Sequence, residues 1–252
     1  MPSATETFST GMRAALKGLR VASGSAEVRA TYLALVAAVF VLAALIDIGG
    51  IWTVWHYTGG DPGTGWLALL GLWLLRIAGT LIVLLVAPLL GLFVVNTFFP
   101  FLAERVFFAA MRIVAPARAA ELAATDGLGF ARGIAINLAR MALFIGLTVL
   151  TFVVSLIPVV GAIAGPAMSV YFTARAMSWE LLDPYFDKRK MGFAEQRAFV
   201  AEHRAAMLGF GVPIGLLMAI PFVGPLMFGL TQASAAVLVA EAIEGVATPE
   251  AS

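Results

Sequence analysis

Residues 141–174 read MALFIGLTVLTFVVSLIPVVGAIAGPAMSVYFTA, and residues 205–240 read AAMLGFGVPIGLLMAIPFVGPLMFGLTQASAAVLVA. Neither stretch holds a charged residue, and each is interrupted near its middle by proline and glycine. The interruptions match, because Ile157-Pro158-Val159-Val160-Gly161 recurs as Ile220-Pro221-Phe222-Val223-Gly224, 63 residues later. Proline and glycine end helices and form turns, so each stretch predicts a helical hairpin with a tight tip.

The arms of these hairpins are short for a membrane crossing. A hydrocarbon core of about 30 Å needs about 20 helical residues. The arm from Met141 to Ile157 has only about 17 residues, or about 25 Å of helix. The hairpins therefore either cross fully or enter the membrane and return, which is allowed where the tip backbone is buried in protein or wetted by a cavity.

The composition places the whole chain in a membrane. Of its 252 residues 61% are hydrophobic and only 12% are charged, against about 25% charged in soluble domains. Two further apolar segments, residues 30–55 and 65–99, each hold one charge, Asp47 and Arg76 respectively. They predict two spanning helices, the second of them overlong, so that it must tilt, kink at Pro88 or project from the membrane.

The N-terminal segment predicts an amphipathic helix. Apolar residues fall on one helical face and basic residues fall between them: Phe8, Met12, Leu16 and Leu19, with Arg13, Lys17 and Arg20. Such a helix lies in the membrane interface with its basic side chains toward lipid headgroups. A solvated N-terminal helix is the alternative.

We therefore expect an all-α integral membrane protein that forms a single domain, residues 1–252. Its expected segments are an amphipathic N-terminus (1–29), two spanning helices (30–99), a connector (100–140), a first hairpin (141–182), a second connector (183–204), a second hairpin (205–242) and a tail (243–252).

The basic residues predict the orientation. Residues 1–30 hold four Lys or Arg, residues 99–140 hold five and residues 175–204 hold six, whereas residues 47–65 and both hairpin tips hold none. The excess of Lys and Arg in cytoplasmic segments then places the N-terminus and both connectors in the cytoplasm.

The end of the second span carries a candidate anion site. Pro100 frees backbone groups, and the next helical turn, at Leu102 and Ala103, would present N–H groups to an anion. Arg29 lies at the same edge of the first span, and Glu104 would orient or balance the basic group. In the alternative interpretation Arg29 and the neighbouring Arg105 are anchors at the cytoplasmic face, and Glu104 pairs with its neighbour.

Arg76 is a second candidate. An ionisable side chain inside a span usually faces the protein interior or a pathway, where a cation would serve as a stepping charge for an anion. Alternatively, Arg76 extends to the outer interface. Asp47 has the same two interpretations.

Catalysis has little support in the sequence. The chain has no cysteine, and its two histidines, His56 and His203, are far apart. Asp183 and Asp187 are four residues apart but lack the rest of a catalytic set, and no common catalytic or nucleotide-binding motif is present. We expect no enzyme activity, no cofactor, no metal and no nucleic-acid partner.

The two tips and the connector between them resemble the CysZ sulfate permease family, also called the EI24 membrane-protein family. The resemblance extends more loosely to Leu102-Ala103-Glu104 and Arg29. The matching residues in family order are Ile157-Pro158 with Gly161, Asp183-Pro184-Tyr185-Phe186-Asp187, Arg189 with Lys190, Phe193 with Glu195 and Arg197, and Ile220-Pro221 with Pro225.

The resemblance implies a homo-oligomer in the bacterial inner membrane, with two long spanning helices and two hairpins that penetrate partly. It also implies import of sulfate for sulfur assimilation and cysteine biosynthesis, without ATP. Carried over residue by residue, it implies a sulfate site at Arg29, Leu102 and Glu104.

The chain departs from the family pattern at two positions of that site. Val28 stands where the family has a first arginine before Arg29, and Phe101 stands where it has a glycine. One guanidinium fewer is expected to weaken binding of a doubly charged anion by about 1.5 to 3 kcal/mol. Arg76 is a candidate to compensate, and Arg76 and Arg105 are the candidates for an anion pathway.

Three functions remain open from the sequence. The first is a sulfate permease or channel, passive or ion-coupled, in which the hairpins with Pro158, Gly161, Pro221 and Gly224 at their tips line the pathway. The second is a non-transporting membrane protein of the same fold that acts by lipid or protein contact. The third is a transporter of another oxyanion.

Overall fold

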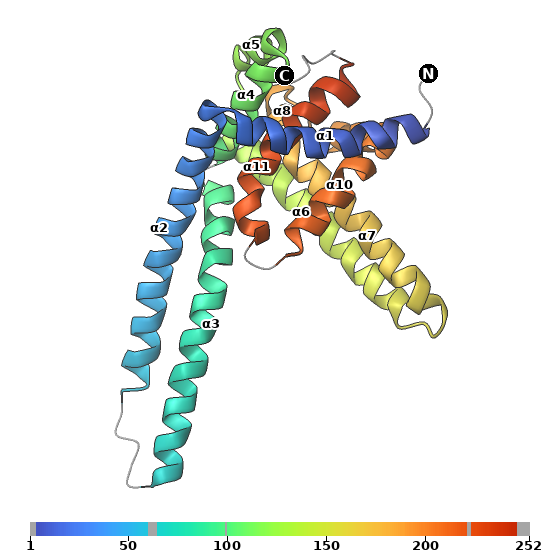
Figure 1. Cartoon of the computed structure of the whole chain (residues 1–252). Helices are drawn as coiled ribbons and strands as arrows, with labels where there is room; N and C mark the ends of the chain where they lie inside the picture. Colours follow the sequence, from blue (N-terminus) through green and yellow to red (C-terminus); the bar gives the residue numbers. More distant parts are fainter. Residues whose placement is uncertain (1–3, 60–64, 99, 221–222, 246–252) are drawn as a thin grey trace. The chain divides into compact units, whose positions relative to one another are not determined.

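The computed structural model describes residues 4–59, 65–98, 100–220 and 223–245 (Figure 1). Across these ranges the chain is helical and contains no strand, which confirms the all-α class. The helices are α1 (Ala4–Gly24), α2 (Ala26–Tyr57), α3 (Trp66–Phe98), α4 (Pro100–Val114), α5 (Pro116–Ala123), α6 (Phe130–Ser155), α7 (Val160–Leu181), α8 (Asp183–Lys188), α9 (Phe193–Glu202), α10 (Arg204–Met218), α11 (Val223–Leu238) and a closing π-helical turn, η1 (Val239–Ile243).

The described helices form two compact units. The smaller unit, residues 33–102, contains most of α2 together with α3, and the larger unit combines residues 1–32 with residues 103–252. Each unit is described by itself below.

The smaller unit is a pair of long antiparallel helices (Figure 1). Glycines sit at the contacts between them: Gly50 faces Val83, Gly79 faces Val54, and Gly91 faces Ala43. Because a glycine has no Cβ, the helices approach closely at these points, as membrane helices commonly do. α3 continues through Pro88 as one 33-residue helix, so the overlong second span is a single element about 50 Å in length.

Within the described part of the chain, three helices are long and apolar enough to cross a membrane: Ala26–Tyr57, Trp66–Pro88 and Ala131–Ser155. Exposed aromatic side chains gather where α2 ends and α3 begins, among them Trp52, Tyr57 and Trp66. Such aromatic belts form where lipid meets water. The protein is therefore a membrane protein with transmembrane helices.

In the larger unit α1 crosses α10 and α11 through small residues (Figure 1). A Cβ on Gly11 would overlap with the carbonyl oxygen of Ala206, and a Cβ on Gly18 would overlap with the Cα of Ser234. The Ser234 hydroxyl donates to the carbonyl oxygen of Ala15 at 2.9 Å. The face of α1 that enters the core thus consists mainly of glycine and alanine, with Val21 near its end.

The large apolar side chains of α1 point away from that core. Phe8, Met12 and Leu16 are 39%, 43% and 54% exposed, and Arg13 and Arg20 are exposed beside them. This arrangement suits the expected position in the membrane interface, which stays a prediction.

The first hairpin is longer than expected. α6 begins at Phe130 rather than near Met141, and its 26 residues span about 39 Å, enough to cross a membrane. Arg132 and Arg140 lie within it, because a charged residue limits the apolar span but does not end a helix. α7 returns over 22 residues.

The second hairpin is shorter and more buried than the first. α10 and α11 have 15 and 16 residues, about 22 to 24 Å of helix, which is less than the hydrocarbon thickness. Residues 231–240 of α11 and η1 are all buried in the larger unit. A partly penetrating hairpin stays a prediction for this element.

The two hairpin tips repeat one local arrangement. Gly161 packs against the carbonyl oxygen of Ser155 at the end of α6, and Gly224 packs in the same way against Met218 at the end of α10. Both contacts leave no room for a Cβ, which explains why glycine stands at both positions. Pro158 lies in the turn of the first tip, and Pro221 lies outside the described residues.

Candidate functional site

Glu104 forms an ion pair with a residue that is distant in the sequence. Its carboxylate lies 2.9 Å from Nζ of Lys188, so the pair joins α4 to α8. The Lys188 ammonium also lies 5.9 Å from the centre of the Phe108 ring. The side chains of Glu104 and Lys188 are partly buried, at 30% and 17% exposed. The site that the sequence predicts around Glu104 therefore contains a lysine as well.

Arg29 is exposed in the first turn of α2, and its Nη1 donates to the carbonyl oxygen of Ser23 at 2.6 Å. Leu102 lies in the first turn of α4, where backbone N–H groups have no acceptor within the helix. Its side chain is outside the description. Arg105 is exposed on the next turn of α4. Arg29 and Glu104 thus have different immediate partners, and a common anion site stays a prediction.

Arg76 reaches from α3 to the end of α2 in the smaller unit. Its Nε and Nη2 donate to Oγ1 and to the carbonyl oxygen of Thr58, at 3.1 and 2.7 Å. The guanidinium also lies 5.0 Å from the Trp55 ring and 5.6 Å from the Trp73 ring. A cation at a helix C-terminus among interfacial tryptophans is well placed to stabilise the hairpin. A role in an anion pathway stays a prediction.

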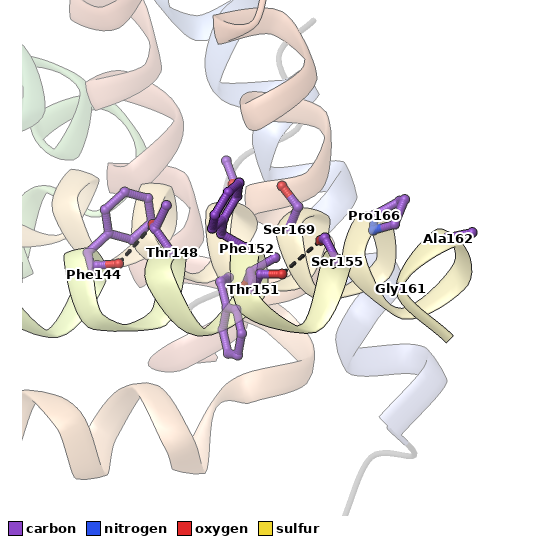
Figure 2. A pocket seen from close by; sticks show the side chains of 12 residues that line it. Phe144, Thr148, Thr151, Phe152, Ser155, Gly161, Ala162, Pro166 and Ser169 are labelled. Carbon is purple, nitrogen blue, oxygen red and sulfur yellow. Dashed lines mark hydrogen bonds between the residues drawn. The ribbon is translucent and has the colours of Figure 1, made fainter. Parts of the chain in front are cut away.

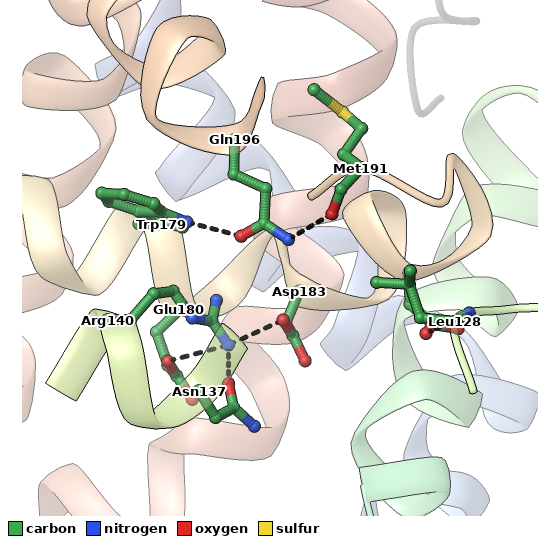
Figure 3. A network of polar contacts seen from close by, with 9 residues as sticks. Leu128, Asn137, Arg140, Trp179, Glu180, Asp183, Met191 and Gln196 are labelled. Carbon is green, nitrogen blue, oxygen red and sulfur yellow. Dashed lines mark hydrogen bonds and ion pairs between the residues drawn. The ribbon is translucent and has the colours of Figure 1, made fainter. Parts of the chain in front are cut away.

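The larger unit contains a buried arginine that sequence analysis treated only as a boundary of the first hairpin (Figure 3). Arg140 of α6 is 8% exposed, and its Nη2 lies 2.7 Å from Asp183 Oδ1 and 3.7 Å from Glu180 Oε2. Nη2 also donates to Asn137. Nε and Nη1 are buried and have no hydrogen-bond partner in the described part of the chain. The sequence signal was a spacing of three residues, which separates Asn137 from Arg140 and also separates Glu180 from Asp183.

The two aspartates of the second connector do not act together. Asp183 binds Arg140, whereas Oδ1 of Asp187 accepts from the backbone N–H of Leu128 at 2.9 Å. Burial, together with the Glu104 and Asp183 carboxylates, raises the pKa of Asp187 above its ordinary value, although the Leu128 N–H and Lys188 oppose this. Among the described residues no group of three His, Cys, Asp or Glu side chains is placed to hold a metal ion.

Ion pairs and a hydrogen bond join the C-terminal segment to both connectors and to α1. Glu244 accepts from Arg118 Nε at 2.9 Å and from the Tyr185 hydroxyl at 3.0 Å. Glu241 pairs with Lys17 of α1 at 2.6 Å. These contacts tie α1, α5 and α8 to the segment after α11.

The fold and these polar contacts define a helical membrane protein with several spanning helices, whose paired charges lie mainly at helix ends and in connectors. The family model described as sulfate transporter CysZ/etoposide-induced protein 2.4 matches residues 15–228. The chain belongs to this family. A comparison with curated proteins found no match.

Proposed function

We propose that the protein is a sulfate permease or channel of the bacterial inner membrane, which imports sulfate for cysteine biosynthesis. The family match over residues 15–228 carries this proposal, because the description of the family names a sulfate transporter. Transport is passive or ion-coupled and uses no ATP. We propose transport rather than catalysis because the sequence holds no catalytic motif.

The proposed sulfate site consists of Arg29, Leu102 and Glu104, and we add Lys188 to it. The position of Lys188 supports the addition, because its ammonium lies 2.9 Å from Glu104. In this site Glu104 orients the Lys188 ammonium and balances its charge, so that the oxyanion meets a lysine already held in position. An additional cation offsets part of the binding free energy that is lost because Val28 stands in place of an arginine.

We infer the orientation and the assembly from the charge pattern and the family resemblance. The basic segments support a cytoplasmic position of the N-terminus and of both connectors. Arg76 and Arg105 are proposed as further cations on the anion pathway. A homo-oligomer embedded in the lipid bilayer completes the proposal, with the two hairpins lining its pathway.

A second candidate is a non-transporting membrane protein of the same family. Val28 in place of an arginine favours it, as does the exposed position of Arg29 against the Ser23 carbonyl. Such a protein would act through lipid or protein contacts of its basic face. Transport of another oxyanion is a third candidate.

Sulfate is expected to stabilise the purified protein against heat. A ligand at 100 times its Kd adds about 2.7 kcal/mol to the free energy of unfolding, which corresponds to a rise in Tm of about 5 to 10 °C for a chain of this size. The measurement is a thermal unfolding scan in sulfate and in chloride at equal ionic strength.

Arg29→Ala and Lys188→Ala should lose the sulfate-specific rise in Tm, whereas Arg20→Ala, which removes an exposed arginine from α1, should keep it. Equal stabilisation by chloride, or a sulfate effect that all three variants retain, would argue against the proposed site.

A further inference from the structure

A cavity of about 460 Å³ opens between α6 and α7 of the first hairpin (Figure 2). Hydroxyl groups from both helices line it, and none of its lining residues is charged. The five hydroxyl side chains are Thr148, Thr151 and Ser155 of α6, and Ser169 and Thr173 of α7.

The packing of the two helices explains why this cavity exists. At the tip, Gly161 and Gly165 bring α7 against Ser155, so the helices touch there. Farther from the tip the bulky rings of Phe144 and Phe172 stand along the same seam. A space between the helices is left along this seam.

The hydroxyl groups of the two helices differ in their hydrogen bonds. Thr148, Thr151 and Ser155 donate to carbonyl oxygens of their own helix, at 2.9, 2.8 and 2.7 Å. Ser169 and Thr173 make no hydrogen bond within the described residues, so their protons remain available. They stand four residues apart on one face of α7, with Cβ atoms about 5 to 6 Å apart, close enough for both to reach one small ligand.

The same seam continues to Arg140. Positions 140, 144 and 148 share a face of α6, so Arg140 lies one helical turn beyond Phe144, which lines the cavity. Glu180 of α7 lies 3.7 Å from Arg140, which shows that the two helices are still neighbours there. Nε and Nη1 of Arg140, which have no hydrogen-bond partner among the described residues, add N–H donors beyond the hydroxyl-lined part.

We propose that this seam binds a small oxyanion, with the hydroxyl groups of Ser169 and Thr173 as its donors. The proposal deepens the proposed function and rests on it, since the bound ion would be the transported one. A metal cation would find no carboxylate among the lining residues, and a lipid chain would gain nothing from five hydroxyls. The Asp183 and Glu180 carboxylates repel an anion near Arg140, which favours the hydroxyl-lined part as its resting position.

The chain has no cysteine, so single cysteine variants can test the cavity directly. Ser169→Cys is treated with a membrane-impermeant methanethiosulfonate that carries a sulfonate group. Val170→Cys is the matched control, because Val170 is the next residue, is 53% exposed and does not line the cavity. Thermal unfolding checks that each variant is folded.

We expect sulfate to leave the labelling rate of the exposed Val170→Cys thiol unchanged. Sulfate should slow the labelling of Ser169→Cys several-fold, while gluconate at equal ionic strength should not. Thr173→Cys should behave like Ser169→Cys. Labelling of Ser169→Cys that sulfate does not slow, or slowing by sulfate that Val170→Cys shares, would overturn the proposal.

Two further arms separate the sources of an oxyanion. Protection by sulfate in a phosphate-free maltoside detergent supports a free ion as the ligand. Protection by phospholipid alone, with no added effect of sulfate, overturns it in favour of a lipid headgroup. Because labelling needs no transport, sulfate protection without flux would support the cavity and reject the permease, and flux without protection would reject the cavity alone.

Discussion

Replacing Gly18 by alanine is expected to lower the free energy of unfolding by about 2 kcal/mol, although alanine favours a helix by about 1 kcal/mol over glycine. The new Cβ would overlap with the Cα of Ser234, which is backbone and cannot rotate away. α1 and α11 must then separate, which weakens the hydrogen bond from Ser234 to Ala15. The measurement is thermal unfolding in detergent, with an expected fall in Tm of about 4 to 8 °C.

Gly24→Ala is the control for this prediction. Gly24 ends the same helix, and nothing lies within 4 Å of a Cβ built there. The same chemical change should therefore leave Tm within about 1 to 2 °C. A Gly18→Ala variant as stable as Gly24→Ala would mean that α1 does not pack on α11 as described.

Replacing Arg140 by methionine is expected to destabilise the protein by about 2 to 3 kcal/mol. The change removes a buried guanidinium that joins α6 to Asp183 and Glu180. Breaking a buried ion pair costs about 3 to 5 kcal/mol, and the value expected here is lower because the two carboxylates are 37% and 48% exposed and remain hydrated.

Arg132→Met is the matched control, since Arg132 lies on the same helix but is exposed. It should change the free energy of unfolding by less than about 0.5 kcal/mol. A double-mutant cycle of Arg140→Met with Asp183→Asn should give a coupling energy of about 1 to 3 kcal/mol. Additive effects of the two changes would show that the pair does not form.

The hairpins were predictable because proline and glycine mark turns wherever they interrupt an apolar run. The repeated tip also singled out Gly161 and Gly224, which make the same close contact with the preceding helix. The start of α6 was less predictable. Arg140 ends the charge-free run, but both it and Arg132 belong to the helix, so counting charges placed its start too late.

The sequence pattern also did not predict which face of α1 is buried. In water the large apolar face would be expected to enter the core, but Phe8, Met12 and Leu16 face outward, and Gly11 and Gly18 pack inward. A bilayer accepts large apolar side chains, so membrane helices pack through small residues instead. The periodicity located the helix but did not predict which face it buries.

The partners of the candidate site residues are distant in sequence and had no local signal. Lys188 meets Glu104 across 84 positions, and Asp183 meets Arg140 across 43. Such pairs depend on how helices pack, which hydrophobic periodicity alone does not specify. By contrast, Arg76 could be singled out as the one charge of its apolar segment, and its contacts are with the adjacent helix end.

The central claim of sulfate transport is tested most directly by uptake of labelled sulfate into liposomes that contain the purified protein, measured beside chloride and phosphate. The account predicts uptake selective for sulfate, reduced at least tenfold in Arg29→Ala and Glu104→Ala and unchanged in Arg20→Ala. Absence of uptake by folded protein would contradict transport and favour the non-transporting candidate, and uptake that Arg29→Ala and Glu104→Ala leave unchanged would contradict the proposed site.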